Sequence, residues 1–219
     1  MKILFLKTVP VVSWSSKKSL NFAPGISTLS ILCAGLVVFG VGEALLIAAG
    51  AGVSPWTVFA QGISIIFNWS IGYSTLAVSV GVLLFWIPLK QVPGLGTLLN
   101  ATVIAVAIEL SLPYLPQPEL YALKVVEIVI GILMVGLGSG MYLIANLGPG
   151  PRDGLMLGLQ RLIGFPIAIV RMSLEISAVV VGWLLGGTVG LGTLLFALGI
   201  GYAVSIGLFS VSRVSTKSK

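Results

Sequence analysis

Charged side chains are rare in this sequence, and two of them stand four positions apart within one apolar segment. Arg171 and Glu175 both fall in the segment 167–185. Residues four apart lie on the same face of a helix, so the guanidinium and the carboxylate can reach each other. This spacing fits a substrate or proton site with a built-in counter-charge, and it fits equally a structural ion pair that holds helices together.

Other polar side chains within apolar segments are further candidates for binding a solute. Glu43 lies deep in the segment 28–49, and Glu109 lies near the end of 95–112. Each predicts a functional carboxylate, although Glu109 also fits a carboxylate solvated at the edge of an apolar layer. Gln61 and Asn100 can bond either a solute or a neighbouring helix. Glu127 begins its segment, where we expect an interfacial residue without a specific role.

Two glycine- and proline-rich breaks each precede a short apolar segment, 56–69 and 152–164. Proline is well tolerated at a helix start, so each break predicts a short helix that begins there. A re-entrant helix would point its free N–H groups and partial positive charge into the protein, with Trp56 at one start and Arg152 and Asp153 at the other. An interfacial helix would instead make Trp56 an anchor and Arg152 a marker of the cytoplasmic side.

The amino-acid composition indicates that the chain lies in a lipid bilayer. The 219 residues are 57% hydrophobic and 8% charged, and the mean hydropathy is +1.13, whereas soluble domains carry about 25% charged residues. We therefore predict an all-α membrane protein with six spans at 28–49, 71–89, 95–112, 125–147, 167–185 and 191–211. The sequence has 0 histidines, which excludes His-ligated metal sites and Ser-His-Asp triads. We expect neither a cofactor nor an enzyme.

The chain aligns with itself after a shift of 96 residues. The letters GLGTLL at 94–99 return at 190–195, and Gly52 and Pro55 fall on Gly148 and Pro151. Each half then holds three spans and one short helix, and an odd number of spans inverts the second half. We therefore predict two inverted three-helix repeats, each with a short re-entrant or interfacial helix.

Positive charge supports this topology with both termini in the cytoplasm. Lys124 alone is placed outside, Arg171 lies within a span, and ten basic residues face the cytoplasm: Lys2, Lys7, Lys17, Lys18, Lys90, Arg152, Arg161, Arg213, Lys217 and Lys219. The predicted parts are a cytoplasmic leader at 1–27, repeat 1 at 28–113, an external loop at 114–124, repeat 2 at 125–212 and a cytoplasmic tail at 213–219.

Several stretches together resemble a known family. They are GPGPRDGLMLGL at 148–159, SPW at 54–56 with QGIS at 61–64, PGLGT at 93–97 with Asn100, Val170 and Arg171 with Glu175, and GWLLGG at 182–187 before GLGT at 190–193. The chain resembles the YczE/YyaS/YitT group of bacterial integral membrane proteins, closest to the YczE branch, over residues 30–210. The resemblance implies a protein of the bacterial inner membrane and no particular substrate. Family members often carry Asp where this chain has Glu109.

The symmetry, the short helices and the intramembrane charges predict a secondary transporter or permease for a small anionic or zwitterionic solute. Two alternatives stay open: a substrate-binding membrane component of a multi-subunit transporter, and a membrane partner protein that transports nothing. The expected partners are the lipid bilayer and the solute. No nucleic acid is expected, because the basic residues are scattered, and assembly into a homo-oligomer stays open.

Overall fold

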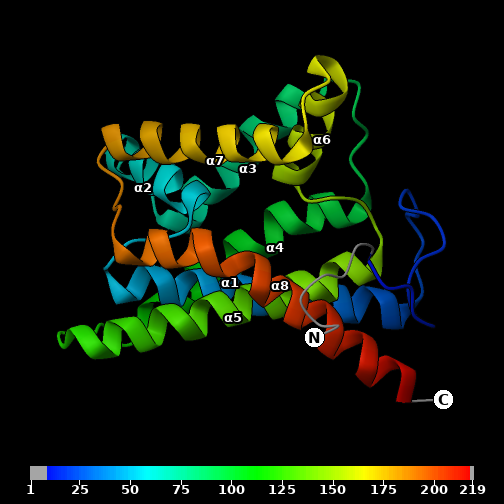
Figure 1. The fold of residues 1–219 in the computed structure, drawn as a ribbon, viewed down its shortest axis with the longest axis horizontal. Coiled ribbons are helices and arrows are strands. Elements are labelled where there is room, and N and C mark those ends of the chain that lie inside the picture. The colour runs from blue at the N-terminus through cyan, green and yellow to red at the C-terminus, as the bar shows by residue number, and fades with distance from the viewer. Residues whose placement is uncertain (1–8, 218–219) are drawn as a thin grey trace.

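The computed structural model describes residues 9–217, and in this part of the chain every regular element is helical (Figure 1). Lys2 and Lys7 of the predicted leader and Lys219 of the tail lie outside the described residues. The elements are α1 (Ile26–Ala49), α2 (Pro55–Phe67), α3 (Ile71–Trp86), α4 (Leu95–Ser111), the 3-10 helix η1 (Leu112–Tyr114), α5 (Tyr121–Ala145), α6 (Pro151–Ile163), α7 (Ile167–Leu184) and α8 (Leu191–Lys217).

The helices recur with the spacing of the sequence repeat. A shift of 96 residues carries α1 to α4 onto α5 to α8 in order. The two short helices match most closely, since α2 and α6 both have 13 residues and both begin at a proline. The breaks therefore do start short helices, as the sequence predicts.

The described helices include five that are long and apolar enough to cross a membrane: α1, α4 extended through η1, α5, α7 and α8. The span predicted at 71–89 is shorter than expected, because the helix there, α3, has only 16 residues and ends at Trp86. It follows α2 at a bend of 112°, and the count reaches six when this bent pair is taken as one span.

Figure 1 shows the helices in two layers. One contains α1, α5 and α8, and the other contains α2, α3, α6 and α7; α4 packs on α1 and also on α3 of the second layer. The central pair, α1 and α5, runs antiparallel with a very close approach. A Cβ atom at Gly42 would lie only 2.8 Å from the carbonyl oxygen of Gly131, so these positions admit little besides glycine.

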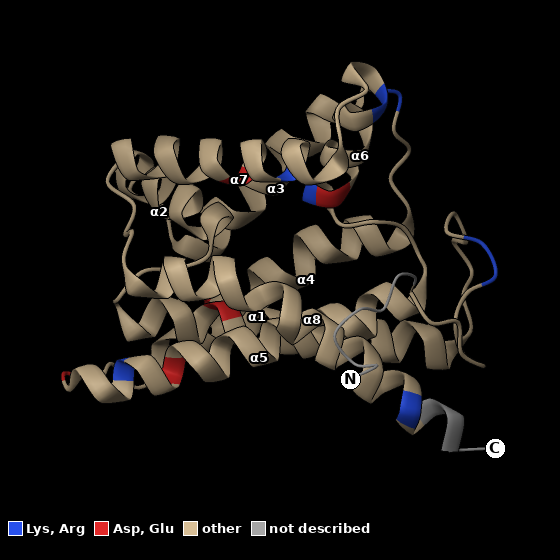
Figure 2. Ribbon diagram, in the orientation of Figure 1, with Lys and Arg blue, Asp and Glu red and all other residues tan. Residues whose placement is uncertain are grey.

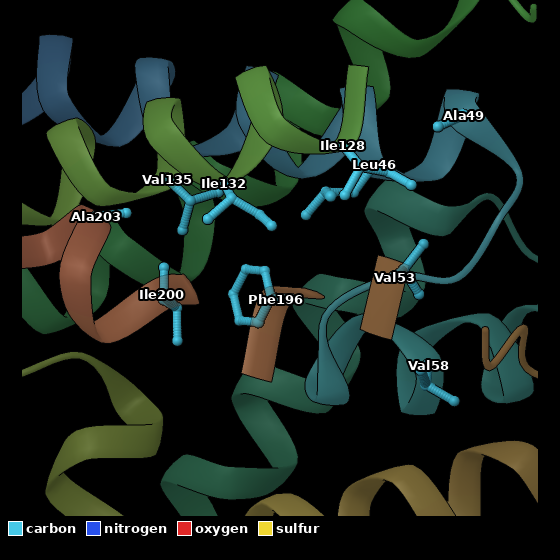
Figure 3. Packing of buried hydrophobic residues seen from close by; sticks show 10 residues of the cluster. All are labelled: Leu46, Ala49, Val53, Val58, Ile128, Ile132, Val135, Phe196, Ile200 and Ala203. Atoms are coloured by element: carbon cyan, nitrogen blue, oxygen red, sulfur yellow. The ribbon is translucent and has the colours of Figure 1, made fainter. Parts of the chain in front are cut away.

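The core extends from this central pair to α8 (Figure 3). Ile128, Ile132 and Val135 of α5 pack with Phe196 and Ile200 of α8. Figure 3 shows these side chains directed into the space between the two helices. Burial of these apolar side chains holds the long helices α1, α5 and α8 in fixed positions relative to one another.

The breaks before α2 and α6 are clasped by the opposite half of the chain. Gly52 and Gly148, which the repeat equates, both have positive φ angles of 103° and 112°, a conformation that favours glycine. The N–H of Gly192 donates to the carbonyl oxygen of Ala51 at 2.8 Å, and the N–H of Gly96 donates to that of Leu147 at 2.7 Å. Each half thus holds the start of the other half's short helix.

One contact is present in the first half only. Helix α3 packs along α4, whereas among the described elements α7 and α8 make no comparable contact. Most residues of α7 are exposed. The second layer is therefore closed against the first on the α3 side and separated from it on the α7 side.

Candidate substrate-binding site

A cavity of about 390 Å³ lies between the two layers, and both short helices begin at its wall. Ser54, Pro55 and Trp56 reach it from the start of α2, and Pro149, Gly150, Arg152 and Asp153 reach it from the start of α6. The first N–H groups of a helix have no partner within the helix and carry partial positive charge. The cavity therefore receives two helix N-termini, an arrangement suited to anionic groups.

Arg152 and Trp56, which the repeat equates, meet in this cavity. The guanidinium carbon of Arg152 lies 5.4 Å from the ring centroid of Trp56, within cation–π range. Arg152 also interacts electrostatically with Glu43, Asp153 and Glu175. Figure 2 shows acidic and basic residues side by side at the start of α6. The two equivalent positions thus form one contact rather than two separate sites.

The start of α6 is held by hydrogen bonds from three other helices. The hydroxyl of Tyr142 on α5 donates to Oδ2 of Asp153. The indole Nε1 of Trp86 on α3 donates to the carbonyl oxygen of Pro151 at 2.9 Å, and Oγ1 of Thr97 on α4 donates to that of Pro149 at 2.6 Å. Because these donors come from packed helices, Arg152 and Asp153 are set in place before any ligand arrives.

Arg171 and Glu175 form the predicted ion pair on α7. Nε of Arg171 lies 2.9 Å from Oε1 of Glu175, and their side chains are 55% and 32% exposed. Both residues line the cavity, together with the starts of the short helices. The pair is formed within one helix, and Glu175 also interacts electrostatically with Arg152 on α6.

Glu43 lies behind the cavity wall. It is completely buried on α1, and its Oε2 lies within hydrogen-bond distance of the hydroxyl oxygens of Ser54 and Thr57, at 2.8 Å each. Ser54 itself lines the cavity. Ser54 therefore lies between the carboxyl group of Glu43 and the cavity.

Asn100 lines the cavity, but two other predicted site residues lie elsewhere. Oε1 of Gln61 accepts from the backbone N–H of Thr188 at 2.9 Å and ties α2 to the loop after α7. Oε2 of Glu109 accepts from the N–H of Gly72 at 3.0 Å and ties α4 to the start of α3. Both bonds connect segments of the fold, so we now interpret Gln61 and Glu109 as structural.

Sequence reasoning missed the hydroxyl groups of the site. Tyr142, Ser54 and Thr57 were not candidates, although Ser54 is equated by the repeat with Gly150 and Thr57 with Asp153. That register could have identified Thr57 through Asp153, but it gives no signal for Tyr142, whose equivalent is Leu46. Glu127, expected at an interface, is buried within the chain, and its Oε2 has no partner among the described residues.

Across the part of the chain that the structure describes, no group of three or more Cys, Asp or Glu side chains could hold a metal ion.

The fold defines a multi-pass helical membrane protein with a cavity at the starts of two short helices. The chain belongs to a family of unknown function, DUF6198, whose model matches residues 26–208.

Relatives agree with this assignment and with the resemblance read from the sequence. An uncharacterized protein of Haemophilus influenzae is 42% identical over 95% of both chains. The uncharacterized membrane protein YczE of Bacillus subtilis is 31% identical over 75% of this chain and 78% of its own. The uncharacterized protein YyaS of the same organism is 27% identical over 74% and 82%. No solved structure matches the chain.

Proposed function

We propose that this protein is a secondary transporter or permease that binds and moves a small anionic or zwitterionic solute without transforming it chemically. The observation that supports this most is the cavity at which two helix N-termini, Arg152 and Arg171 gather. Its volume of about 390 Å³ falls within the range of small-molecule sites. Broken or short helices that aim their N-termini at a shared site are a recurrent transporter device.

The mixture of charges narrows the solute class. Arg152 and the helix N-termini attract a carboxylate or phosphate, while Asp153 and Glu175 offer acceptors to an ammonium group. Arg152 sits over the Trp56 ring, and that aromatic surface also suits the apolar part of a small solute. A solute carrying both an anionic and a cationic group uses more of these contacts than a simple anion.

We further propose that the two halves are inverted in a bacterial plasma membrane, with both termini in the cytoplasm. The antiparallel course of α1 and α5 in Figure 1 and the matching helix bounds support this. In that arrangement, the turn before α3 faces outward and the equivalent turn before α7 faces the cytoplasm.

Single cysteines test this topology. In a Cys33→Ser background, Trp69→Cys and Phe165→Cys place thiols at exposed positions that are 96 residues apart. We expect a membrane-impermeant maleimide to label the first from outside intact cells and the second only after the membrane is opened. Labelling of both from the same side would contradict the inverted repeat.

Transport is tested in proteoliposomes with radiolabelled glycine, glutamate, succinate and glycine betaine as probes. We expect at least one probe to enter faster than in empty vesicles, and Arg152→Gln to abolish that entry. Arg161→Gln is the matched control, because Arg161 is an exposed arginine on the same helix. Binding of a probe without entry would favour the substrate-binding component, and neither binding nor entry would favour a non-transporting partner.

A further inference from the structure

Three side-chain oxygens form a closed triangle behind the cavity. Oε2 of Glu43 lies 2.8 Å from Oγ of Ser54 and 2.8 Å from Oγ1 of Thr57. The two hydroxyl oxygens are themselves 2.9 Å apart. All three residues are at most 1% exposed, so no bulk water separates these atoms.

The number of hydrogens in this triangle depends on the state of Glu43. Three contacts at hydrogen-bond distance need three hydrogens, and Ser54 and Thr57 supply one each. With an ionised Glu43, the single hydrogen of Ser54 would have to serve both of its contacts. With a proton on Oε2, Glu43 donates to Ser54, Ser54 donates to Thr57 and Thr57 donates to Glu43. The ring is then complete.

The other carboxyl oxygen of Glu43 also indicates that this carboxyl group is protonated. Oε1 of Glu43 is buried and has no hydrogen-bond partner within the described residues. An unpartnered buried oxygen costs much less in a neutral carboxylic acid than in a carboxylate, which carries a full charge. The oxygen atoms of the triangle are only 2.8–2.9 Å apart, which is the usual distance of O–H···O hydrogen bonds.

The charged group that Glu43 faces is Arg152, across the start of α2. The remaining titratable residues on elements packed against α1 are Glu109 on α4, Tyr114 on η1, and Tyr121, Lys124, Glu127 and Tyr142 on α5. Arg152 is also the cation that lines the cavity. Glu43 and a bound anion therefore compete for one guanidinium.

We propose that Glu43, hydrogen-bonded to Ser54 and Thr57, binds the proton that drives solute movement; this inference rests on the proposed transport function. In the loaded state, the proton sits on Oε2, and Arg152 is available to the anionic group of the solute. Release transfers the proton to water in the cavity, through Ser54 at its wall. The carboxylate that remains attracts Arg152 and weakens its hold on the solute. Proton and solute therefore move in the same direction.

The proton site is tested first by infrared spectroscopy of the purified full-length protein. A protonated carboxylic acid has a carbonyl stretch that a carboxylate lacks. We expect this band at neutral pH, lost in Glu43→Gln and kept in Glu119→Gln, a control at an exposed loop carboxylate. Size-exclusion profiles establish that both variants are folded. A spectrum without the band, or a band whose intensity is unchanged in Glu43→Gln, would overturn the proposal.

Coupling is tested in vesicles that contain the pH-sensitive dye pyranine, with the four labelled solutes as probes. We expect solute entry to acidify the lumen in the wild type. Glu43→Gln, which resembles the protonated state, is expected to exchange labelled for unlabelled solute but to lose at least 90% of gradient-driven accumulation. Wild-type entry without acidification would overturn the coupling and leave transport standing. Failure of every probe to enter would contradict transport itself, and the infrared band would still decide whether Glu43 carries a proton.

Discussion

The two halves of this protein share one helical plan but differ in how their layers meet. In the first half, α3 packs along α4, and Glu109 bonds the N–H of Gly72 across that contact. In the second half, Ser205 and Ala168 occupy the equivalent positions, and the hydroxyl of Ser205 bonds within its own helix. The second half therefore lacks a hydrogen bond equivalent to that between Glu109 and Gly72, here called the α3–α4 clasp, and its α7 stands apart from α8. For a transporter, such asymmetry distinguishes a closed side from an open side.

The halves also place their carboxylates differently. In the first half, the acid near the short helix is Glu43 on α1, and Thr57 on α2 bonds to it. In the second half, the acid is Asp153 on α6 itself, at the position equivalent to Thr57, and its partner is Tyr142 on α5. The first acid is sealed away and the second lines the cavity. Under the proposed mechanism, the repeated scaffold assigns proton binding to the first half and solute binding to the second.

The largest effect is expected where the halves meet, at Arg152. We expect Arg152→Gln to weaken solute binding at least about 30-fold, because losing one partner of a charge pair that the bound solute shields from water costs about 2–5 kcal/mol. Equilibrium binding of the transported probe measures this, with Arg161→Gln as the control. Equal affinities for the two variants would show that the cavity charge does not select the solute.

The next effect tests the close approach that relates the halves. We expect Gly42→Ala to lower the free energy of unfolding by about 1–3 kcal/mol, since its Cβ would lie 2.8 Å from the oxygen of Gly131. Gly81→Ala on α3 is the control, because a Cβ there meets no atom within 4 Å. Thermal unfolding in detergent measures both variants. A Gly42→Ala protein as stable as Gly81→Ala would contradict the tight packing of α1 on α5.

These two predictions show how much of the molecule can be inferred from sequence. The glycine pattern and the Pro-started breaks are local signals, so the short helices were predicted to within a residue of their starts. Their meeting at one cavity required the fold, because Trp56 and Arg152 come from opposite halves. The residue types also could not separate Asn100, which lines the cavity, from Gln61, which binds the backbone of Thr188.

The asymmetry between the halves was beyond the sequence for a different reason. Identities at a shift of 96 residues report what the halves share, whereas the closed and open sides arise from positions where they differ. Glu109 was noted as a candidate for solute binding, because a carboxylate near the end of a span can serve either purpose. Only its bond to Gly72, 37 positions away, assigns it to the closed side.

A smaller effect is expected from removing the α3–α4 clasp, the hydrogen bond between Glu109 and Gly72. Glu109→Ala removes one hydrogen bond at an exposed site, worth about 1 kcal/mol, or a fivefold change in the balance between packed and separated α3. Spin labels at Val80 and Val106 report the α3–α4 distance, and labels at the equivalent Ile176 and Tyr202 report α7–α8; all four side chains are exposed.

In the parent protein, we expect the α3–α4 distances to be shorter and more narrowly distributed than the α7–α8 distances. Glu109→Ala is expected to broaden the first distribution and leave the second unchanged. Matching distributions in the two halves of the parent protein would remove the distinction between a closed and an open side. A variant that broadens both would show that Glu109 acts on the whole assembly instead of its own half.

The smallest effect is expected at Trp56, the first-half counterpart of Arg152. A cation–π contact contributes about 0.5–1 kcal/mol at an accessible site, so Trp56→Leu is expected to weaken binding of the transported probe two- to fivefold. Trp56→Phe keeps an aromatic face under the guanidinium of Arg152 and should recover part of this loss. Binding affinities of the two variants separate ring chemistry from volume. If Trp56→Leu and Trp56→Phe bind equally, the ring only fills space, and Arg152 is positioned by α6 and its carboxylate neighbours alone.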